Sequence, residues 1–221
     1  MNTELEKEVK QVLANINNEF KTNYKSLRRI RKYYIWKYIS THQKLSEDFI
    51  REFQDKVRWN DISRRQRLSE DFIREFQDEV DWYSISLQQR LSEDFIREFQ
   101  DKLSWGCISS YQKTSEDFIR EFKDKVVWSN ISYGKKLSES FIREFADKVD
   151  WTNISKSQDL SIDFIREFKD KIDWTELFRN NKNIVITEDF IREFKDEVDW
   201  WYISSWKLLP EDIIRKYRTN I

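Results

Sequence analysis

Residues 46–53 read Ser-Glu-Asp-Phe-Ile-Arg-Glu-Phe, and this stretch decides the fold because the chain repeats it. Its core, Phe-Ile-Arg-Glu-Phe, stands at residues 49–53, 72–76, 95–99, 118–122, 141–145, 164–168 and 190–194, with a degenerate copy at 213–217. Tryptophan keeps the same 23-residue step at positions 36, 59, 82, 105, 128, 151 and 174, and then follows at 200. A fixed period of this length is the sequence signature of a repeat protein.

Each repeat is predicted to form two short helices. Ser46 has the side chain of a good N-cap, and the two acids after it suit the positive start of a helix dipole. The apolar residues that follow fall on one helical stripe, namely Phe49, Ile50, Phe53 and Val57. A shorter helix is expected from about residue 59 to 66, capped in several repeats by the Asp before the Trp (Asp81, Asp150, Asp173 and Asp199). Helices this short are marginal in water, so stacking between repeats has to supply the core.

These patterns predict an all-α fold, an α-solenoid of eight short two-helix repeats behind an N-terminal helical cap. We expect the cap over residues 1–35 and the solenoid over 36–221, with units that start at residues 36, 59, 82, 105, 128, 151, 174 and 200. Apolar residues at helical spacing predict one helix in the cap (Leu5, Val9, Leu13, Ile16 and Phe20). In the seventh unit Phe178 replaces the usual Ser, and three residues are inserted around 179–183.

The repeat Leu-Ser-Glu-Asp-Phe-Ile-Arg-Glu-Phe, followed by Asp-Trp and Ile-Ser, resembles a short helical repeat of uncharacterised proteins from giant viruses, phages and some bacteria. The match covers about residues 36–221. This resemblance implies a repeat protein of viral type that acts in the host cytoplasm on a host or defence factor, and it carries no known catalytic residue.

Composition argues against an enzyme. Two Gly, one Pro, one Cys (Cys107) and one His (His42) in 221 residues leave no material for phosphate-cradling loops, a disulfide framework or a usual zinc site. We therefore expect no catalytic residue, no metal and no cofactor. The formal net charge is −1, the first residues lack the apolar core of a signal peptide, and no window has the apolar length of a membrane span. A soluble cytoplasmic protein without a membrane partner is the expectation.

Two regular rows of side chains each allow a structural and a functional interpretation. The tryptophans could stack on nucleic-acid bases, but their fixed phase favours a place in the core. The motif arginines could follow phosphates (Arg51, Arg74, Arg97, Arg120, Arg143, Arg166, Arg192 and Arg215). Carboxylates accompany almost every one of them, which favours ion pairs within and between repeats. Candidate pairs within one helix are Arg51 with Asp55 and Glu52 with Lys56.

The positions that differ between repeats are the better candidates for binding. A constant scaffold that varies at fixed offsets is how repeat proteins display binding residues, although drift at exposed positions gives the same pattern. The mixture of aromatic, Arg and Asn side chains suits contact with a protein. The candidate protein-binding face consists of Tyr38, Asn60, Asp61, Arg64, Arg65, Tyr83, Gln88, Tyr111, Asn130, Tyr133, Asn153, Lys156, Trp201 and Trp206.

A second candidate surface is basic, because no acid lies between Glu19 and Glu47. Its candidate phosphate-binding residues are Lys21, Lys25, Arg28, Arg29, Arg31, Lys32 and Lys37. The structural alternative is a solvated cap whose charges balance an acidic neighbour. The sequence thus predicts a non-enzymatic scaffold that binds another protein, and binding of nucleic acid or a phosphate ligand through the basic end is the alternative function.

Overall fold

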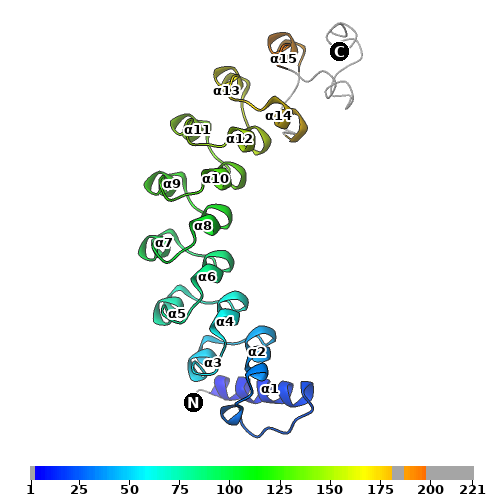
Figure 1. Ribbon diagram of the computed structural model, residues 1–221, viewed down its shortest axis with the longest axis vertical. Coiled ribbons are helices and arrows are strands. Elements are labelled where there is room, and N and C mark those ends of the chain that lie inside the picture. Colours follow the sequence, from blue (N-terminus) through cyan, green and yellow to red (C-terminus); the bar gives the residue numbers. More distant parts are fainter. Residues whose placement is uncertain (1–2, 181–186, 198–221) are drawn as a thin grey trace. The chain divides into compact units, whose positions relative to one another are not determined.

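The computed structural model describes residues 3–180 and 187–197, and all the regular structure in these ranges is helical. The contacts divide the chain into two compact units, residues 1–108 and 109–221. Each unit is a stack of short two-helix repeats, the all-α solenoid that the sequence predicts (Figure 1). No helix in the described ranges is long and apolar enough to cross a membrane. The repeat expected from residue 200 lies outside the described residues.

The first unit begins with the cap. It comprises α1 (Thr3–Glu19), the 3-10 helix η1 (Leu27–Arg29) and α2 (Tyr33–His42), which starts ahead of Trp36 and so crosses the expected end of the cap. The repeats follow as α3 (Glu47–Glu52), α4 (Trp59–Arg65), α5 (Glu70–Glu75), α6 (Trp82–Gln88), α7 (Glu93–Glu98) and α8 (Trp105–Tyr111), which spans the division. In Figure 1, α3, α5 and α7 form one row and α2, α4 and α6 the other, while α1 packs against α2 and α3.

The second unit repeats the same two rows. Its helices are α9 (Glu116–Glu121), α10 (Trp128–Gly134), α11 (Glu139–Glu144), α12 (Trp151–Ser157), α13 (Ile162–Glu167), α14 (Trp174–Asn180) and α15 (Glu188–Glu193). The helices α10, α12 and α14, which begin at tryptophans, pack on one another in order. We call the segments that lead from a Trp-bearing helix to the next motif helix connectors; they cover residues 43–46, 66–69, 89–92, 112–115, 135–138 and 158–161.

The motif helices begin where the sequence predicts and end sooner. Ser46 Oγ accepts a hydrogen bond from Phe49 N, and the same N-cap recurs at Ser69, Ser92, Ser115, Ser138, Ser161 and Thr187. The first motif helix stops at Glu52, and Val57 reaches the core through a turn in which its N–H bonds to Phe53 O at 3.0 Å. The ion pairs predicted for Arg51 with Asp55 and Glu52 with Lys56 are therefore not formed, because their second members lie beyond the end of the helix.

The core is aromatic. The first Phe and the Ile of each motif are fully buried, as Phe72 and Ile73 show. The Trp82 ring packs against both motif phenylalanines of the following helix, with centroids 6.3 Å from Phe95 and 4.8 Å from Phe99. Its Nε1 donates to Gln77 O at 2.9 Å, a carbonyl of the preceding turn. The core role predicted for the tryptophans is confirmed. The indole N–H explains why Trp keeps the same position in successive repeats, because it bonds to the carbonyl five residues earlier. Trp36 is buried, whereas the later described tryptophans keep an edge in solvent.

Aspartate caps begin some of the Trp-bearing helices. Asp81, Asp150 and Asp173 accept hydrogen bonds from the N–H three residues ahead, at 3.2, 2.9 and 3.0 Å. The predicted caps are confirmed at these three positions, and Asp199 lies outside the described residues.

A buried serine joins each repeat to the next. Ser63 is fully buried, and its Oγ accepts a hydrogen bond from Asp81 N at 2.9 Å. The same bond links Ser40 to Arg58, Ser86 to Ser104, Ser109 to Val127, Ser132 to Asp150 and Ser155 to Asp173. The Ser86 hydroxyl also donates to Trp82 O at 2.7 Å, so its donor is satisfied as well. This serine is the second residue of the Ile-Ser pair, to which the sequence analysis gave no structural role.

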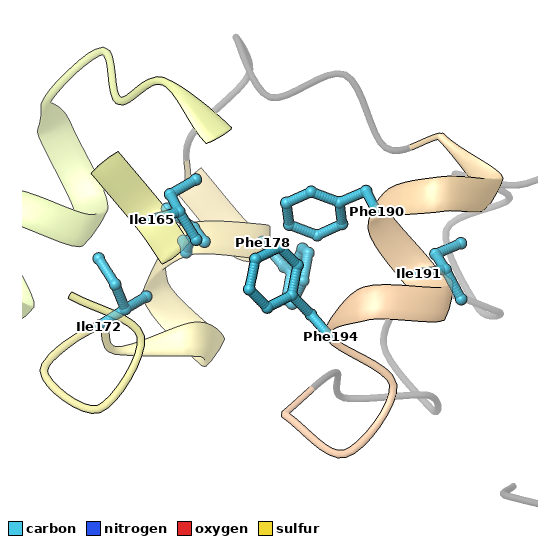
Figure 2. Close-up of a cluster of buried hydrophobic side chains, with 7 residues drawn as sticks. Ile165, Ile172, Phe178, Phe190, Ile191 and Phe194 are labelled. Atoms are coloured by element: carbon cyan, nitrogen blue, oxygen red, sulfur yellow. The ribbon is translucent and has the colours of Figure 1, made fainter. Parts of the chain in front are cut away.

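The seventh unit replaces this hydrogen bond with apolar packing. Phe178 stands where the other repeats have the serine, and its ring lies edge-on to Phe190 with centroids 6.2 Å apart. Ile165 and Ile191 belong to the same buried cluster (Figure 2). A phenylalanine needs no partner at a fixed spacing, which suits a repeat whose 23-residue period is broken by an insertion.

A row of glutamines holds neighbouring connectors together. Gln66 is buried, its Nε2 donates to Ser40 O at 3.1 Å and Gln43 O at 2.8 Å, and its Oε1 accepts from Leu45 N at 3.0 Å. Gln89 and Gln158 repeat this arrangement in their own connectors. Among the described residues, no buried side-chain nitrogen or oxygen lacks a hydrogen-bond partner. Each repeat therefore completes the polar groups of the one before it.

The N-terminal helix α1 bonds to the first connector through the carboxylate of Glu8. Glu47 Oε1 accepts the N–H of Ser69 at 2.6 Å, and Glu70, Glu116 and Glu139 do the same for the serine of their next repeat. In α1, Glu8 plays this part for Ser46, whose N–H lies 2.8 Å from Glu8 Oε1. The cap is thus a helix of unrelated sequence that supplies the glutamate of a missing repeat.

The serine bond can be tested on one helix. Ser132→Ala leaves the part-buried Asp150 N–H without an acceptor, so we expect a loss of about 1–3 kcal/mol in the free energy of unfolding. Ser129→Ala, also on α10 but exposed, should change it by less than about 0.5 kcal/mol. Chemical denaturation followed by circular dichroism measures both, and equal effects would contradict the assigned role.

A substitution at Lys135 should stabilise the fold, in contrast to Ser132→Ala, because Lys135 occupies the place of the connector glutamine. Its ammonium donates to Gln112 O, and burial lowers the pKa of this amine. Charging it is thus costlier in the folded state than in the unfolded state, so stability should rise with pH between the lowered pKa and 10.5.

Lys135→Gln should raise the free energy of unfolding by about 0.5–2 kcal/mol near neutral pH and flatten this alkaline rise. Thermal unfolding between pH 7 and 11 measures it. If Lys135→Gln is less stable than the wild type at pH 7, the lysine does not destabilise this position relative to glutamine, and the interpretation is wrong.

Candidate functional site

The motif arginines are engaged by carboxylates. Arg51 Nε lies 2.8 Å from Glu75 Oε2 in the next repeat, its Nη1 lies 3.3 Å from Asp48, and its guanidinium stacks over the Phe72 ring at 4.9 Å. Hydrogen bonding to Glu75 raises the pKa of Arg51. Arg74 in the first unit and Arg120 in the second make equivalent contacts. The prediction of ion pairs within and between repeats is confirmed for the described motif arginines, which are not available as a track for phosphates, and Arg215 lies outside the described residues.

Two further arginine contacts depart from the 23-residue period. Before the first motif helix, Arg28, a member of the predicted phosphate-binding set, pairs with Glu52. Beside the insertion, Arg166 of α13 reaches Glu193 of α15, with Nη2 and Oε2 2.8 Å apart. The bond to Arg166 lowers the pKa of the Glu193 carboxyl.

The remaining basic residues near the cap are spread over several elements. Lys25 bonds to Asn23 Oδ1 at 2.8 Å, and a hydrogen bond to Tyr34 raises the pKa of Lys32. Lys21, Arg29, Arg31 and Lys37 are exposed, in the loop after α1, in η1, before α2 and within α2. Arg31 lines a pocket of about 600 Å³ whose other walls include Trp36, Trp59, Asp55, Lys56 and Arg58. The predicted set is therefore distributed over the loop after α1, η1 and α2, and Arg28, Lys25 and Lys32 are engaged by neighbouring groups.

The predicted protein-binding residues of the first unit divide into packed and exposed ones. Tyr38 is half-buried between a Phe20 ring 5.2 Å away and a stacked His42 ring at 4.6 Å. Asp61 lies 3.4 Å from Arg58 Nε, and Asn60 lines the pocket beside Trp59. Five members are exposed, namely Asn60, Arg64, Arg65, Tyr83 and Gln88.

In the second unit, three predicted residues share one end of neighbouring helices. Tyr111 and Tyr133, 67% and 59% exposed, stand at the C-terminal ends of α8 and α10. Lys156 of α12 holds its Nζ 5.7 Å from the centre of the Tyr133 ring. A Cβ added to Gly134 would meet Ser110 O at 3.5 Å, so α8 and α10 approach closely beside the two tyrosines. We call Tyr111, Tyr133 and Lys156 the tyrosine patch.

The other predicted residues of this unit are less accessible. Asn130 and Asn153 are half-buried, and Asn153 Nδ2 donates to Ser129 O at 3.3 Å, which ties α12 to α10. Trp201 and Trp206 lie outside the described residues. The exposed part of the predicted face thus consists of Asn60, Arg64, Arg65, Tyr83, Gln88 and the two tyrosines of the tyrosine patch.

Cofactor chemistry has little to build on in the described part of the chain. No group of three or more His, Cys, Asp or Glu side chains there could hold a metal ion. Cys107 is buried in α8, and His42 Nδ1 lies 2.6 Å from the hydroxyl of Thr41. Comparison with protein-family models, with curated proteins and with solved structures finds no match. The function has to be argued from the surface itself.

The ion pair between Arg166 and Glu193 yields a prediction about pH dependence. Because Arg166 lowers the pKa of Glu193, this pair stabilises the fold above the ordinary carboxyl range, and the contribution is lost as pH falls through the lowered pKa. Arg166→Gln should return the pKa of Glu193 towards its ordinary value. Arg192→Gln, which removes the neighbouring arginine that pairs with Glu188 and Asp189, should leave it low. An NMR titration of the side-chain carboxyl distinguishes these results, and an unchanged pKa in Arg166→Gln would contradict the assignment.

Proposed function

We propose that this protein is a non-enzymatic scaffold that binds another protein through exposed side chains of its Trp-bearing helices. The observation that carries the proposal is the exposure of Tyr83, Tyr111 and Tyr133, whose side chains are 61%, 67% and 59% accessible. Within the described residues no aromatic ring contacts any of the three. Tyrosine gives a large contact area at small entropic cost, and its hydroxyl tolerates both water and a partner.

The fold does not need tyrosine at these places. The position of Tyr133 in its repeat is held by Arg64 in α4, Leu87 in α6 and Lys156 in α12, and that of Tyr83 by Asn60 and Thr152. A scaffold that accepts such different side chains sets no packing requirement there. Exposed tyrosines at unconstrained positions are therefore better explained by contact with a partner, because aromatic residues and Arg are enriched at protein interfaces.

Phosphate binding through the basic end has weaker support. Arg28 pairs with Glu52, and Lys25 and Lys32 are engaged locally. The resemblance of the repeat to those of viral and phage proteins supports a cytoplasmic host or defence protein as the partner. No catalytic group enters this proposal.

The test compares two triple variants of the full chain. Tyr83→Ala/Tyr111→Ala/Tyr133→Ala removes the exposed rings, while Lys123→Ala/Asp147→Ala/Lys169→Ala removes exposed side chains from turns after the motif helices. Both should fold, since neither touches a buried group. Quantitative affinity capture from cell extract should enrich a partner with the wild type and the turn variant, and lose it with the tyrosine variant.

The affinity of the captured protein for each variant then tests whether the tyrosines form the interface. Loss of interface hot spots costs about 2 kcal/mol or more, so the tyrosine variant should raise the Kd at least about thirtyfold in isothermal titration calorimetry. Equal affinity of all three proteins would place the interface elsewhere.

A further inference from the structure

The connectors of the first unit carry a second row of basic residues, distinct from the motif arginines. Lys44, Arg67 and Arg90 occupy the same position in three successive connectors, directly after the connector glutamine. All three are exposed, and no ion pair or hydrogen bond involves their side chains within the described residues. The glutamine row fixes their order in space, since Gln66 bonds to Gln43 O and Gln89 to Gln66 O, both at 2.8 Å.

The surface between the first two of these connectors is hollowed. The hollow has a volume of about 650 Å³ and is lined by Thr41, His42, Gln43, Lys44, Leu45, Arg65, Gln66 and Arg67. Three of these side chains are cationic, none is a carboxylate, and His42 presents an exposed imidazole stacked on Tyr38. We call this the basic hollow. Its size falls within the range of small-molecule and cofactor sites.

The acids that follow each connector do not neutralise the basic hollow. Neither Glu47 nor Glu70 lines the hollow; their carboxylates accept the N–H groups of Ser69 and Ser92 at 2.6 Å each. One connector of the second unit differs, because its Lys136 pairs with Asp159 at 3.2 Å. Asp159 thus neutralises Lys136, whereas no carboxylate pairs with Lys44, Arg67 or Arg90 within the described residues.

We propose that the basic hollow binds phosphate groups, and that its ligand is the backbone of a single-stranded nucleic acid that continues along the connectors to Arg90. Guanidinium groups match phosphate oxygens with paired donors, and Arg65 and Arg67 supply two of them. Stacked helices are about 8–10 Å apart, which corresponds to two or three nucleotide steps of about 3.4 Å. An acidic peptide fits less well, because apart from the His42 imidazole the lining offers no exposed aromatic or apolar anchor. This site is independent of the proposed protein interface, although Arg65 belongs to the variable positions.

Two matched variants of the full chain test the site. Lys44→Gln/Arg65→Gln/Arg67→Gln removes three charges from the basic hollow, and the fold tolerates Gln at the place of Arg65 because α6 carries Gln88 there. Arg29→Gln/Arg31→Gln/Lys37→Gln removes the same charge from the cap. Fluorescence anisotropy with a labelled 12-nucleotide RNA and DNA, at 50 and 200 mM salt, measures the affinity. Inorganic phosphate, a nucleoside monophosphate and polyglutamate serve as competitors.

We expect the wild type to bind the strand and to lose about 20-fold in affinity between the two salt concentrations, as three phosphate contacts require. The basic-hollow variant should bind at least about tenfold more weakly at 50 mM salt, and the cap variant within about twofold of the wild type. No binding at 50 mM salt, or equal losses in both variants, would overturn the proposal. Monophosphate that competes as well as the strand would overturn the strand assignment in favour of a free phosphate ligand. Equal competition by polyglutamate would overturn it in favour of an acidic protein.

Discussion

The hydroxyl of the Ile-Ser serine accepts the N–H that begins the next Trp-bearing helix, and much of the structure depends on this bond. The helices of the repeats have six or seven residues, too few to be stable alone in water. Apolar burial supplies the driving force, but it is non-directional and does not set the spacing of repeats. The serine, the connector glutamine and the motif glutamate each bond to a neighbouring repeat. Because an unmade buried hydrogen bond is costly, these three groups fix the spacing.

This division of roles explains why the chain is both highly charged and nearly neutral. Motif arginines such as Arg120 lie between carboxylates of their own and the next repeat, here Asp117 and Glu144 at 2.8 and 2.7 Å. Exposed pairs of this kind add little stability, so their main effect is to neutralise the charge of the surface locally. Functional charge then has to come from positions outside the ladder. Lys44, Arg65 and Arg67 are such positions.

Much of the fold could be predicted from the sequence, because the caps and the fully buried residues recur with the period. Ser46, Phe49 and the tryptophans were assigned correctly for that reason. The end of the motif helix at Glu52 could not be predicted, since Val57 falls on the helical stripe yet is buried through a turn. The buried serine was missed although it recurs at a fixed offset from each Trp up to residue 155, and that recurrence was the available signal. A small polar residue repeated so strictly beside a buried Ile indicates a structural hydrogen bond.

The candidate surfaces were less predictable. Sequence variation marked Tyr38 and Tyr111 alike, but only the packing of the cap shows that Tyr38 lies against Phe20 and His42. The basic hollow was not foreseen, because its charges come from two connectors and the end of α4 and meet only in space. The most direct test of the account is amide hydrogen exchange at Arg58, Asp81 and Asp150, whose N–H groups bond to a serine of the preceding repeat. The account predicts strong protection at all three, lost selectively at Asp150 in the Ser132→Ala variant. Rapid exchange at these amides in the wild type would contradict it.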